Sequence, residues 1–374
     1  MGSIASLLVR PGVVAVGETG MDLYHDRVPV ERQEELFRAH IRMAAAFGLT
    51  LVVHSRDAEE KVLQVLGDGP GVPVVMHCYT GPSKTAAAAA EKGFYVGFAG
   101  PLTYRGNQRL RELAASLPPD RILAETDSPY LSPEPVRGRR NEPANLVYIV
   151  ETLSEAAGRD PGDISAQLMQ NSLRAFQLGE HRRTDLIYSL YGNIYVNMTG
   201  QCTNSCRFCI RDRTDGLGGY YLRHDAEPEE SRLREIVSLL PEGSGRKLVF
   251  CGYGEPTMRP ALLFDLAVSA YRKGYRVRLN TNGTCLLWLS RERTADLLGQ
   301  FGTVSISLNA SSREEYDRLC RPGSPEAWDS LMAFIRMAAE ISSPVLTAVR
   351  YPGVDMDAVG ALAGSLGIPF RIRG

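Results

Sequence analysis

Short apolar runs alternate with longer amphipathic stretches along the whole chain, and this alternation restricts the fold more than any other feature. In the first half, five runs rich in Val, Ile, Leu and aromatic residues are predicted to be β-strands: residues 12–19, 49–55, 73–79, 94–100 and 121–127. Continuous apolar strands separated by helical segments are typical of parallel βαβ units. The first half is therefore predicted to be an α/β domain.

The second half repeats the alternation with six further predicted strands: residues 193–199, 247–256, 275–283, 303–310, 344–352 and 368–373. Six strands with intervening helices indicate a six-unit (β/α) barrel or part of one. In such folds chemistry gathers at the C-terminal ends of the strands, so the residues that follow each run are the candidates for a site.

The length of 374 residues is about twice the usual domain size and predicts two domains. A small charged cluster near residues 178–191 interrupts the alternation. We therefore expect one domain over residues 1–178, a linker over 179–191 and a second domain over 192–374.

Composition excludes several classes of protein. A formal net charge of -1 argues against a chain that coats nucleic acid through bulk electrostatics. No apolar run approaches the roughly 20 residues that cross a bilayer, and no basic segment precedes the first apolar run. Three of the seven cysteines are clustered, which argues against a disulfide framework. We expect a cytoplasmic protein without a membrane partner.

Three cysteines lie within eight residues directly after the strand predicted at 193–199: Cys202, Cys206 and Cys209. Thiolates bind zinc or iron–sulfur clusters. A structural zinc ion would need a fourth ligand, which Cys251 or His224 could supply. The loop also holds Gly, Thr, Asn and Ser, which disfavours three buried structural cysteines.

The spacing CxxxCxxC, with Phe208 just before the last cysteine, resembles the radical S-adenosylmethionine (SAM) enzymes. In that family the three cysteines hold three irons of a [4Fe–4S] cluster, and the fourth iron binds the amino and carboxylate groups of SAM. The resemblance implies both cofactors, an electron donor such as flavodoxin or ferredoxin, and a radical substrate that the sequence does not identify. Phe208 packs near the adenine or serves as an apolar anchor.

Three later strand ends agree with this resemblance. The segment Gly252-Tyr-Gly-Glu-Pro256 is similar to the family's GGEP, although Tyr253 replaces the first glycine. By resemblance, Gly254 and Glu255 contact the methionine amino group of SAM. The segments at 280–283 and 307–309 are similar to the ribose and carboxylate contacts, carried here by Asn282, Ser307 and Asn309. The remaining cysteines of this half, Cys251, Cys285 and Cys320, are scattered and show no second cluster motif.

Four strand ends of the first half carry potential metal ligands: Glu18, His54, His77 and Asp127. Two imidazoles and two carboxylates suit a hard or borderline divalent ion. The surrounding stretches, among them GETGMD, VVHSRDA, MHCYTG and ETDSPYL, resemble the TatD family of metal-dependent hydrolases over residues 12–178. That family hydrolyses phosphodiester bonds, usually as a 3′–5′ DNase, so DNA or another phosphodiester is the implied substrate.

The resemblance also implies roles for the four ligands. Glu18 bridges two divalent ions (Mg, Mn or Zn), His54 and His77 hold one, and Asp127 holds the other and orients or deprotonates the attacking water. Glu18 and Asp127 are thus the expected catalytic residues. Arg137, Arg139 and Arg140 form a basic loop that either touches phosphates or is simply solvated.

The first half departs from the TatD pattern at its beginning. TatD proteins open with a His-x-His pair, whereas no histidine precedes Glu18 here, and neither His25 nor His40 is placed to substitute. We expect a half-built metal site in an unclosed barrel. We also expect the reading frame to continue upstream by roughly 60–80 residues, because each missing βαβ unit needs about 30.

The combined pattern resembles radical SAM proteins that are linked to TatD. It implies an incomplete TIM-like metallohydrolase barrel followed by a six-strand radical SAM partial barrel. Two alternatives remain: a radical enzyme whose TatD-like half is an inactive scaffold, and a binding protein stabilised by zinc.

Overall fold

The computed structural model describes residues 2–25, 27–243 and 245–373. The chain divides into two compact units: residues 14–183, and the N-terminal segment up to Val13 together with residues 184–374. The sequence predicts that residues 1–13 belong to the first domain. By contacts the structure groups this segment with the second unit, where the Tyr220 hydroxyl donates to the Val9 carbonyl at 2.9 Å. Residues 179–183, expected in the linker, belong to the first unit.

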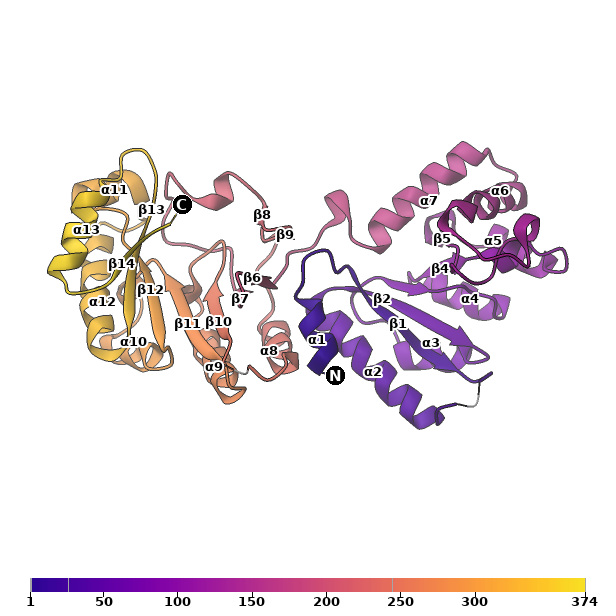
Figure 1. The fold of residues 1–374 in the computed structure, drawn as a ribbon, viewed down its shortest axis with the longest axis horizontal. Helices are drawn as coiled ribbons and strands as arrows, with labels where there is room; N and C mark the ends of the chain where they lie inside the picture. Colours follow the sequence, from indigo (N-terminus) through magenta and orange to yellow (C-terminus); the bar gives the residue numbers. More distant parts are fainter. Residues whose placement is uncertain (1, 26, 244, 374) are drawn as a thin grey trace. The chain divides into compact units, whose positions relative to one another are not determined.

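The first unit contains a five-stranded parallel sheet whose strand order follows the sequence. Its strands are β1 (Ala15–Asp22), β2 (Thr50–Arg56), β3 (Val74–Met76), β4 (Tyr95–Phe98) and β5 (Ile122–Ala124) (Figure 1). All five overlap the predicted runs. Among the described residues β1 and β5 form open edges, as an incomplete barrel requires.

In the described part of this unit, six α-helices connect and cover the sheet: α2 (Val30–Phe47), α3 (Glu59–Leu66), α4 (Ser83–Glu91), α5 (Gln108–Ser116), α6 (Leu146–Ala157) and α7 (Pro161–Ala175). Helix α2 ends at Gly48, whose φ of 70° is left-handed and costs a glycine little. At the start of α7, the Asp160 carboxylate accepts from the backbone of Gly162 and Asp163.

The second unit is built on a seven-stranded sheet with the order β14-β13-β12-β11-β10-β7-β6. The six predicted strands are parallel to one another: β7 (Asn193–Asn197), β10 (Lys247–Cys251), β11 (Arg276–Thr281), β12 (Thr303–Ser307), β13 (Pro344–Val349) and β14 (Phe370–Arg373). The seventh, β6 (Ile187–Leu190), pairs antiparallel with β7 and occupies part of the expected linker. A two-residue turn with positive φ at Tyr191 and Gly192 joins β6 to β7.

The remaining helices of the second unit are α1 (Gly2–Leu8), α8 (Glu230–Leu239), α9 (Pro260–Arg272), α10 (Arg291–Leu298), α11 (Arg313–Cys320), α12 (Ala327–Ile341) and α13 (Met356–Ser365). A small hairpin, β8 (Gly216–Leu217) and β9 (Tyr220–Tyr221), follows the cysteine loop. Helices α9, α12 and α13 pack against β11, β13 and β14 (Figure 1). No helix in the described part of the chain is long and apolar enough to cross a bilayer.

The pleat separates the two faces of the larger sheet, because neighbouring strand residues point to opposite sides. Val277 and Leu279 of β11 are buried, as expected for the helix-covered face. Arg278 and Asn280, which alternate with them, are only half-buried and point to the other side, which we call the inner face.

Candidate active sites

The loop that carries the three cysteines follows β7 at the C-terminal edge of the larger sheet. Backbone hydrogen bonds fasten it to the end of α11: Ser205 and Arg207 donate to the carbonyls of Cys320 and Leu319, at 3.2 and 2.9 Å. The Asn204 side chain adds a 3.0 Å hydrogen bond to the Tyr316 hydroxyl. The loop is therefore held in place by protein contacts.

The three thiols lie in different electrostatic surroundings. Burial raises the pKa of Cys202 to about 11 and also raises the pKa of Cys209. A hydrogen bond with the Cys320 thiol lowers the pKa of Cys206. The positive charge of Arg211 favours the thiolate form of all three cysteines. Three soft donors beside one cation fit a group that binds thiolates, such as an iron–sulfur cluster.

The Gly-Tyr-Gly-Glu-Pro segment lies against the start of the cysteine loop. The Glu255 amide donates to the Gln201 carbonyl at 2.7 Å. A Cβ at Gly254 would lie 2.2 Å from that same carbonyl oxygen, so only glycine allows the approach. This contact brings the end of β10 to the cysteines.

The Glu255 carboxylate is buried and engaged within the protein. It accepts hydrogen bonds from the Thr257 hydroxyl, the Thr281 hydroxyl and the backbone N–H of Asn282, at 2.6, 2.7 and 2.6 Å. Burial raises its pKa in spite of these donors. In this arrangement Glu255 orients the end of β11, and it is the neighbouring Asn282 that reaches the cysteine loop.

The other residues expected to contact SAM lie at the same edge. The Asn282 amide nitrogen is 2.9 Å from the Thr203 hydroxyl and 3.8 Å from the Cys202 sulfur. Ser307 is the half-buried last residue of β12. Asn309 is buried, and its side chain accepts from the Val349 amide at 2.8 Å, which joins the ends of β12 and β13.

Phe208 and the suggested fourth zinc ligands have other partners. Phe208 is 9% exposed, and its ring centroid lies 5.7 Å from that of Tyr351, as an apolar anchor would. The Cys251 sulfur is 3.4 Å from the Tyr188 hydroxyl. The ring nitrogens of His224 are buried without hydrogen-bond partners among the described residues. The thiol that meets the cysteine loop is Cys320, which no local sequence pattern marked.

The four expected ligands of the first unit come together. The Glu18 carboxylate lies 2.9 Å from His54 Nδ1 and 3.8 Å from His77 Nε2. Asp127 Oδ1 lies 3.4 Å from the same His77 nitrogen. Glu18 sits inside β1, where the pairing with β2 is irregular between Val16 and Thr19. Such irregularities redirect side chains near active sites.

Two carboxylates that sequence reasoning passed over complete this cluster. Glu125 accepts from His77 Nδ1 and from the Cys78 amide, each at 2.5 Å, and so turns His77 Nε2 toward Glu18 and Asp127. Asp22 lies 3.5 Å from His54 Nε2 and 2.7 Å from His25 Nδ1. Glu125 stands two residues before Asp127, and this spacing was the available signal.

Ion pairing dominates the electrostatics of this cluster. The hydrogen bond with Glu18 raises the pKa of His54, and the same bond lowers the pKa of Glu18. Burial would lower the pKa of His77, but Asp127, Glu125 and Glu18 outweigh it and raise the pKa to about 10. As placed, no three His, Cys, Asp or Glu side chains within the described ranges converge on one metal position. The oxygen and imidazole donors nevertheless fit a divalent ion that would replace the protons between them.

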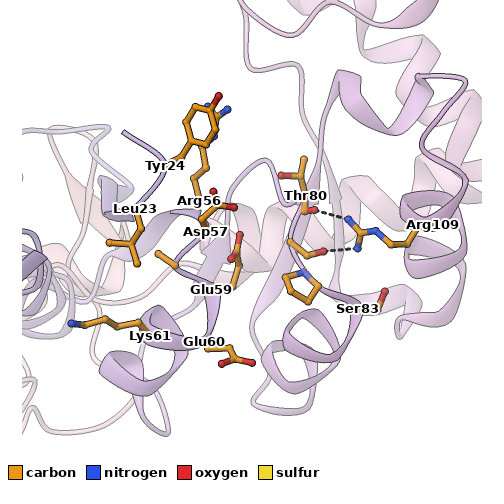
Figure 2. Close-up of a pocket in the computed structure, with 13 residues that line it drawn as sticks. Leu23, Tyr24, Arg56, Asp57, Glu59, Glu60, Lys61, Thr80, Ser83 and Arg109 are labelled. Atoms are coloured by element: carbon orange, nitrogen blue, oxygen red, sulfur yellow. Dashed lines mark hydrogen bonds between the residues drawn. The ribbon is translucent and has the colours of Figure 1, made fainter. Parts of the chain in front are cut away.

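A groove of about 1050 Å³ is lined mainly by residues at or after the ends of β1, β2 and β3, and none of the four expected ligands lines it. Figure 2 shows its lining, which includes Tyr24 just beyond β1 and Arg56 at the end of β2. The Arg56 guanidinium lies 3.9 Å from the Tyr24 ring centroid. Arg109 donates to the carbonyls of Thr80 and Gly81, drawn as dashed lines. Of the predicted basic loop, Arg137 stacks over Tyr104 at 4.1 Å and Arg140 lines a second hollow of about 500 Å³.

Comparison with known proteins supports both halves. Residues 2–177 match the family described as TatD related DNase, and residues 196–364 match the radical SAM superfamily. Over 177 residues the chain is 36% identical to the uncharacterized metal-dependent hydrolase YabD of Bacillus subtilis, covering 47% of this chain and 69% of YabD. It is 35% identical over 185 residues to the 3′-5′ ssDNA/RNA exonuclease TatD of Erwinia tasmaniensis, covering 47% and 71%.

Among solved structures, YJJV, a TatD homologue from Escherichia coli K12, is 29% identical with a TM-score of 0.43. The match covers 44% of this chain and 64% of YJJV, so the chain spans less than two thirds of that protein. The chain belongs to the TatD-related family of metal-dependent hydrolases, and it joins this hydrolase domain to a domain of the radical SAM superfamily.

Proposed function

We propose that the second unit is a radical SAM enzyme that binds a [4Fe–4S] cluster through Cys202, Cys206 and Cys209. The observation that carries the proposal is the contact of Asn282 with Thr203 and Cys202, which joins the expected SAM edge to the cysteine loop. A reduced cluster bound there would supply the one electron that breaks a C–S bond of SAM and gives methionine and a 5′-deoxyadenosyl radical. An electron donor such as flavodoxin or ferredoxin is required as a partner.

The chain's own residues have positioning tasks in this proposal. Glu255 fixes the backbone of Asn282 from its buried position. Gly254 keeps the end of β10 within hydrogen-bond distance of the cysteine loop. Arg211 donates to the carbonyls of Gly200 and Asn204 and places its charge beside the three thiols. Together they orient cofactor and substrate and limit solvent access.

The decisive experiment is anaerobic reconstitution with iron and sulfide, followed by addition of SAM and dithionite. We expect a brown protein that releases 5′-deoxyadenosine. Replacement of the three loop cysteines by alanine should abolish iron binding and 5′-deoxyadenosine together. If the triple variant still binds iron and sulfide in stoichiometric amounts, the cluster assignment is wrong.

We propose in addition that the first unit is a metal-dependent phosphodiesterase of low activity that binds a single divalent ion. The convergence of Glu18, His54, His77 and Asp127 supports it, as does the relative named as an exonuclease of single-stranded DNA and RNA. A divalent ion there would polarise the phosphodiester, and Asp127 would orient the attacking water. The groove of Figure 2 would receive the nucleic-acid strand.

Two alternatives make different predictions. If the TatD-like unit is an inactive scaffold, the protein with manganese will release no nucleotides from single-stranded DNA, whereas 5′-deoxyadenosine will still form with SAM and dithionite. If the cysteine loop is a structural zinc site in a binding protein, metal analysis will give zinc without sulfide and the protein will be colourless. Elemental analysis of protein purified without oxygen distinguishes these cases.

A further inference from the structure

The six parallel strands of the second unit contain basic residues and no acidic ones. Strands β7 and β10 to β14 include no aspartate or glutamate. They carry five cations: Lys247, Arg276, Arg278, Arg371 and Arg373. In a sheet whose outer face packs against helices, such an excess of one charge on the other face calls for an explanation.

Arg278, Arg371 and Arg373 lie on the inner face, as does Arg276 at the start of β11. Arg278 pairs in register with Thr303, while Arg371 and Arg373 pair with Thr347 and Val349. The Arg373 guanidinium donates to Ser305 at 2.7 Å, reaching past β13 to β12. Such a contact is possible only if both side chains project from the same side of the sheet.

Among the residues that the structure describes, Arg278, Arg371 and Arg373 have no anionic partner. Within residues 245–373 and the rest of the described chain, neither Arg278, Arg371 nor Arg373 forms an ion pair with a carboxylate. Arg278 donates instead to the amide oxygen of Asn280, at 2.9 Å. Burial lowers the pKa of Arg278, and the nearby charge of Arg371 lowers it further. Burial and the charge of Arg278 likewise lower the pKa of Arg373.

Arg278 and Arg373 are half-buried like charges without counterions among the described residues, and this is unfavourable because each loses hydration and repels its neighbours. A bound anion would relieve both costs. Arginine suits this task, because its planar guanidinium binds phosphate or carboxylate through two parallel hydrogen bonds.

The arginines lie on the same face of the sheet as residues at the edge expected to bind SAM, where a substrate would have to approach the cofactor. Ser305 and Ser307 of β12 are two residues apart and face the same side, so the Arg373 contact lies one pleat from the expected SAM edge. At the opposite end of the strands, Arg278 and Thr303 line a hollow of about 550 Å³. An anion on the inner face would therefore lie between this hollow and the cofactor.

We propose that Arg278, Arg371 and Arg373 bind the anionic group of the radical substrate, which is a small organic molecule bearing a phosphate or carboxylate. This inference rests on the radical SAM function proposed above for the second unit. It identifies the chemical class of the substrate and assigns the three arginines to its recognition.

The test measures anion binding to the full-length, cluster-loaded protein by isothermal titration calorimetry. The probes are inorganic phosphate, deoxyadenosine 5′-monophosphate, succinate and uncharged deoxyadenosine. Every titration contains EDTA and uses the His54→Ala, His77→Ala background, so that the first unit contributes no metal-bound anion. Arg336→Gln is the matched control, because this exposed arginine lies on α12 and forms no ion pair within the described part of the chain.

We expect at least one phosphate or carboxylate probe to bind, and its affinity to fall about tenfold or more in Arg278→Gln and in Arg371→Gln. The affinity should be unchanged in Arg336→Gln and partly retained in Arg278→Lys. Preference for phosphate over succinate, or the reverse, identifies the anionic group. Because Arg371 is exposed on an edge strand, its variant tests the idea even if Arg278→Gln folds poorly.

Absence of binding by every anionic probe, or equal affinity in the Arg278, Arg371 and control variants, would overturn the proposal. Formation of 5′-deoxyadenosine is measured in parallel on the same samples. Anion binding that depends on these arginines without any 5′-deoxyadenosine would count against the radical function and leave the anion site standing. Formation of 5′-deoxyadenosine without anion binding that depends on these arginines would reject the anion site alone.

Discussion

The side-chain amide of Asn282 lies 3.8 Å from the sulfur of Cys202, although 80 residues separate them in the sequence. The same amide donates to Thr203 at 2.9 Å, and the backbone of Asn282 is held by Glu255 at 2.6 Å. Asn282 thus links the ends of β10 and β11 to the loop that carries the three thiols, through its backbone on one side and its side chain on the other.

Replacing Asn282 by alanine should therefore weaken SAM binding more than cluster binding. We expect about a tenfold loss of SAM affinity, the usual scale for one hydrogen bond to a charged or polar ligand. Iron content should stay near that of the unaltered protein. SAM binding is measured by equilibrium dialysis, with Asn193→Ala, at the exposed β6–β7 turn, as the control. Equal SAM affinity in both variants would contradict the role of Asn282.

Gly254→Ala tests the close approach of β10 to the cysteine loop. The added Cβ would meet the Gln201 carbonyl at 2.2 Å, so we expect destabilisation of about 3 kcal/mol, at the upper end for overpacking. Both tryptophans, Trp288 and Trp328, lie in the second unit, so their fluorescence during urea unfolding reports on that unit alone.

Gly364→Ala is the matched control, because a Cβ there meets nothing within 4 Å. Gly364 lies in α13, where alanine should stabilise by up to about 1 kcal/mol. Stability changes of the same sign in the two variants would show that the contact of Gly254 with Gln201 does not constrain the fold.

A Cys320 variant tests whether a cysteine next to the three-cysteine loop also binds the cluster. Its thiol hydrogen-bonds with Cys206, but it lies at the end of α11 and outside the cysteine motif. We expect Cys320→Ala to retain the iron and sulfide of the unaltered protein, whereas Cys206→Ala loses most of both. Iron and sulfide analysis after anaerobic purification checks this. A loss in Cys320→Ala as large as in Cys206→Ala would make Cys320 a ligand.

Much of the fold was predictable because strand patterns are local. Every predicted apolar run overlaps a strand. His77 and Asp127 follow β3 and β5 as expected, whereas Glu18 and His54 lie inside β1 and β2. What could not be predicted depends on contacts between distant segments. Nothing near Cys320 in the sequence indicates Cys206, and nothing near Val9 indicates Tyr220. Strand β6 was missed because its four residues adjoin a charged cluster and form a strand only by pairing with β7.

For the first unit we expect weak binding of a single divalent ion and little phosphodiesterase activity. Glu18, His54 and His77 can supply one three-ligand set, whereas a two-ion mechanism needs donors for both attacking and leaving oxygens. Manganese titration of the protein followed by calorimetry, and nucleotide release from single-stranded DNA, check both expectations. His54→Ala should abolish the binding, and His181→Ala should leave it unchanged. Rapid nucleotide release that requires His54 would contradict this expectation.

The last prediction concerns the pH dependence of the metal-free first unit. In EDTA, the pKa of His77 is raised to about 10 in the folded state. A raised histidine pKa stabilises the fold fully below the unfolded value of about 6.5, and this contribution is lost as pH rises toward 10. The pKa of Asp22 falls to about 2, because hydrogen bonds and charge from His25 and the charge of His54 outweigh the effect of burial. A lowered carboxylate pKa stabilises above about 4 and loses its effect as pH falls toward 2. Stability should therefore be greatest between about pH 4.5 and 6.5 and should decline at alkaline pH.

A divalent ion should act in the opposite direction, because it binds neutral imidazole and competes with the proton. We expect manganese to raise the melting temperature of the first unit more at pH 8.5 than at pH 6. Unfolding is followed by calorimetry and by tryptophan fluorescence. The first unit contains no tryptophan, so a calorimetric transition without a fluorescence change belongs to the first unit. In His77→Gln the alkaline decline in EDTA should flatten, since the shifted proton is gone, whereas His181→Ala should keep it. If the stability of His77→Gln still declines at alkaline pH as in the unaltered protein, other groups cause the pH dependence. The proton on His77 would then not account for the stabilising contacts with Glu18, Glu125 and Asp127.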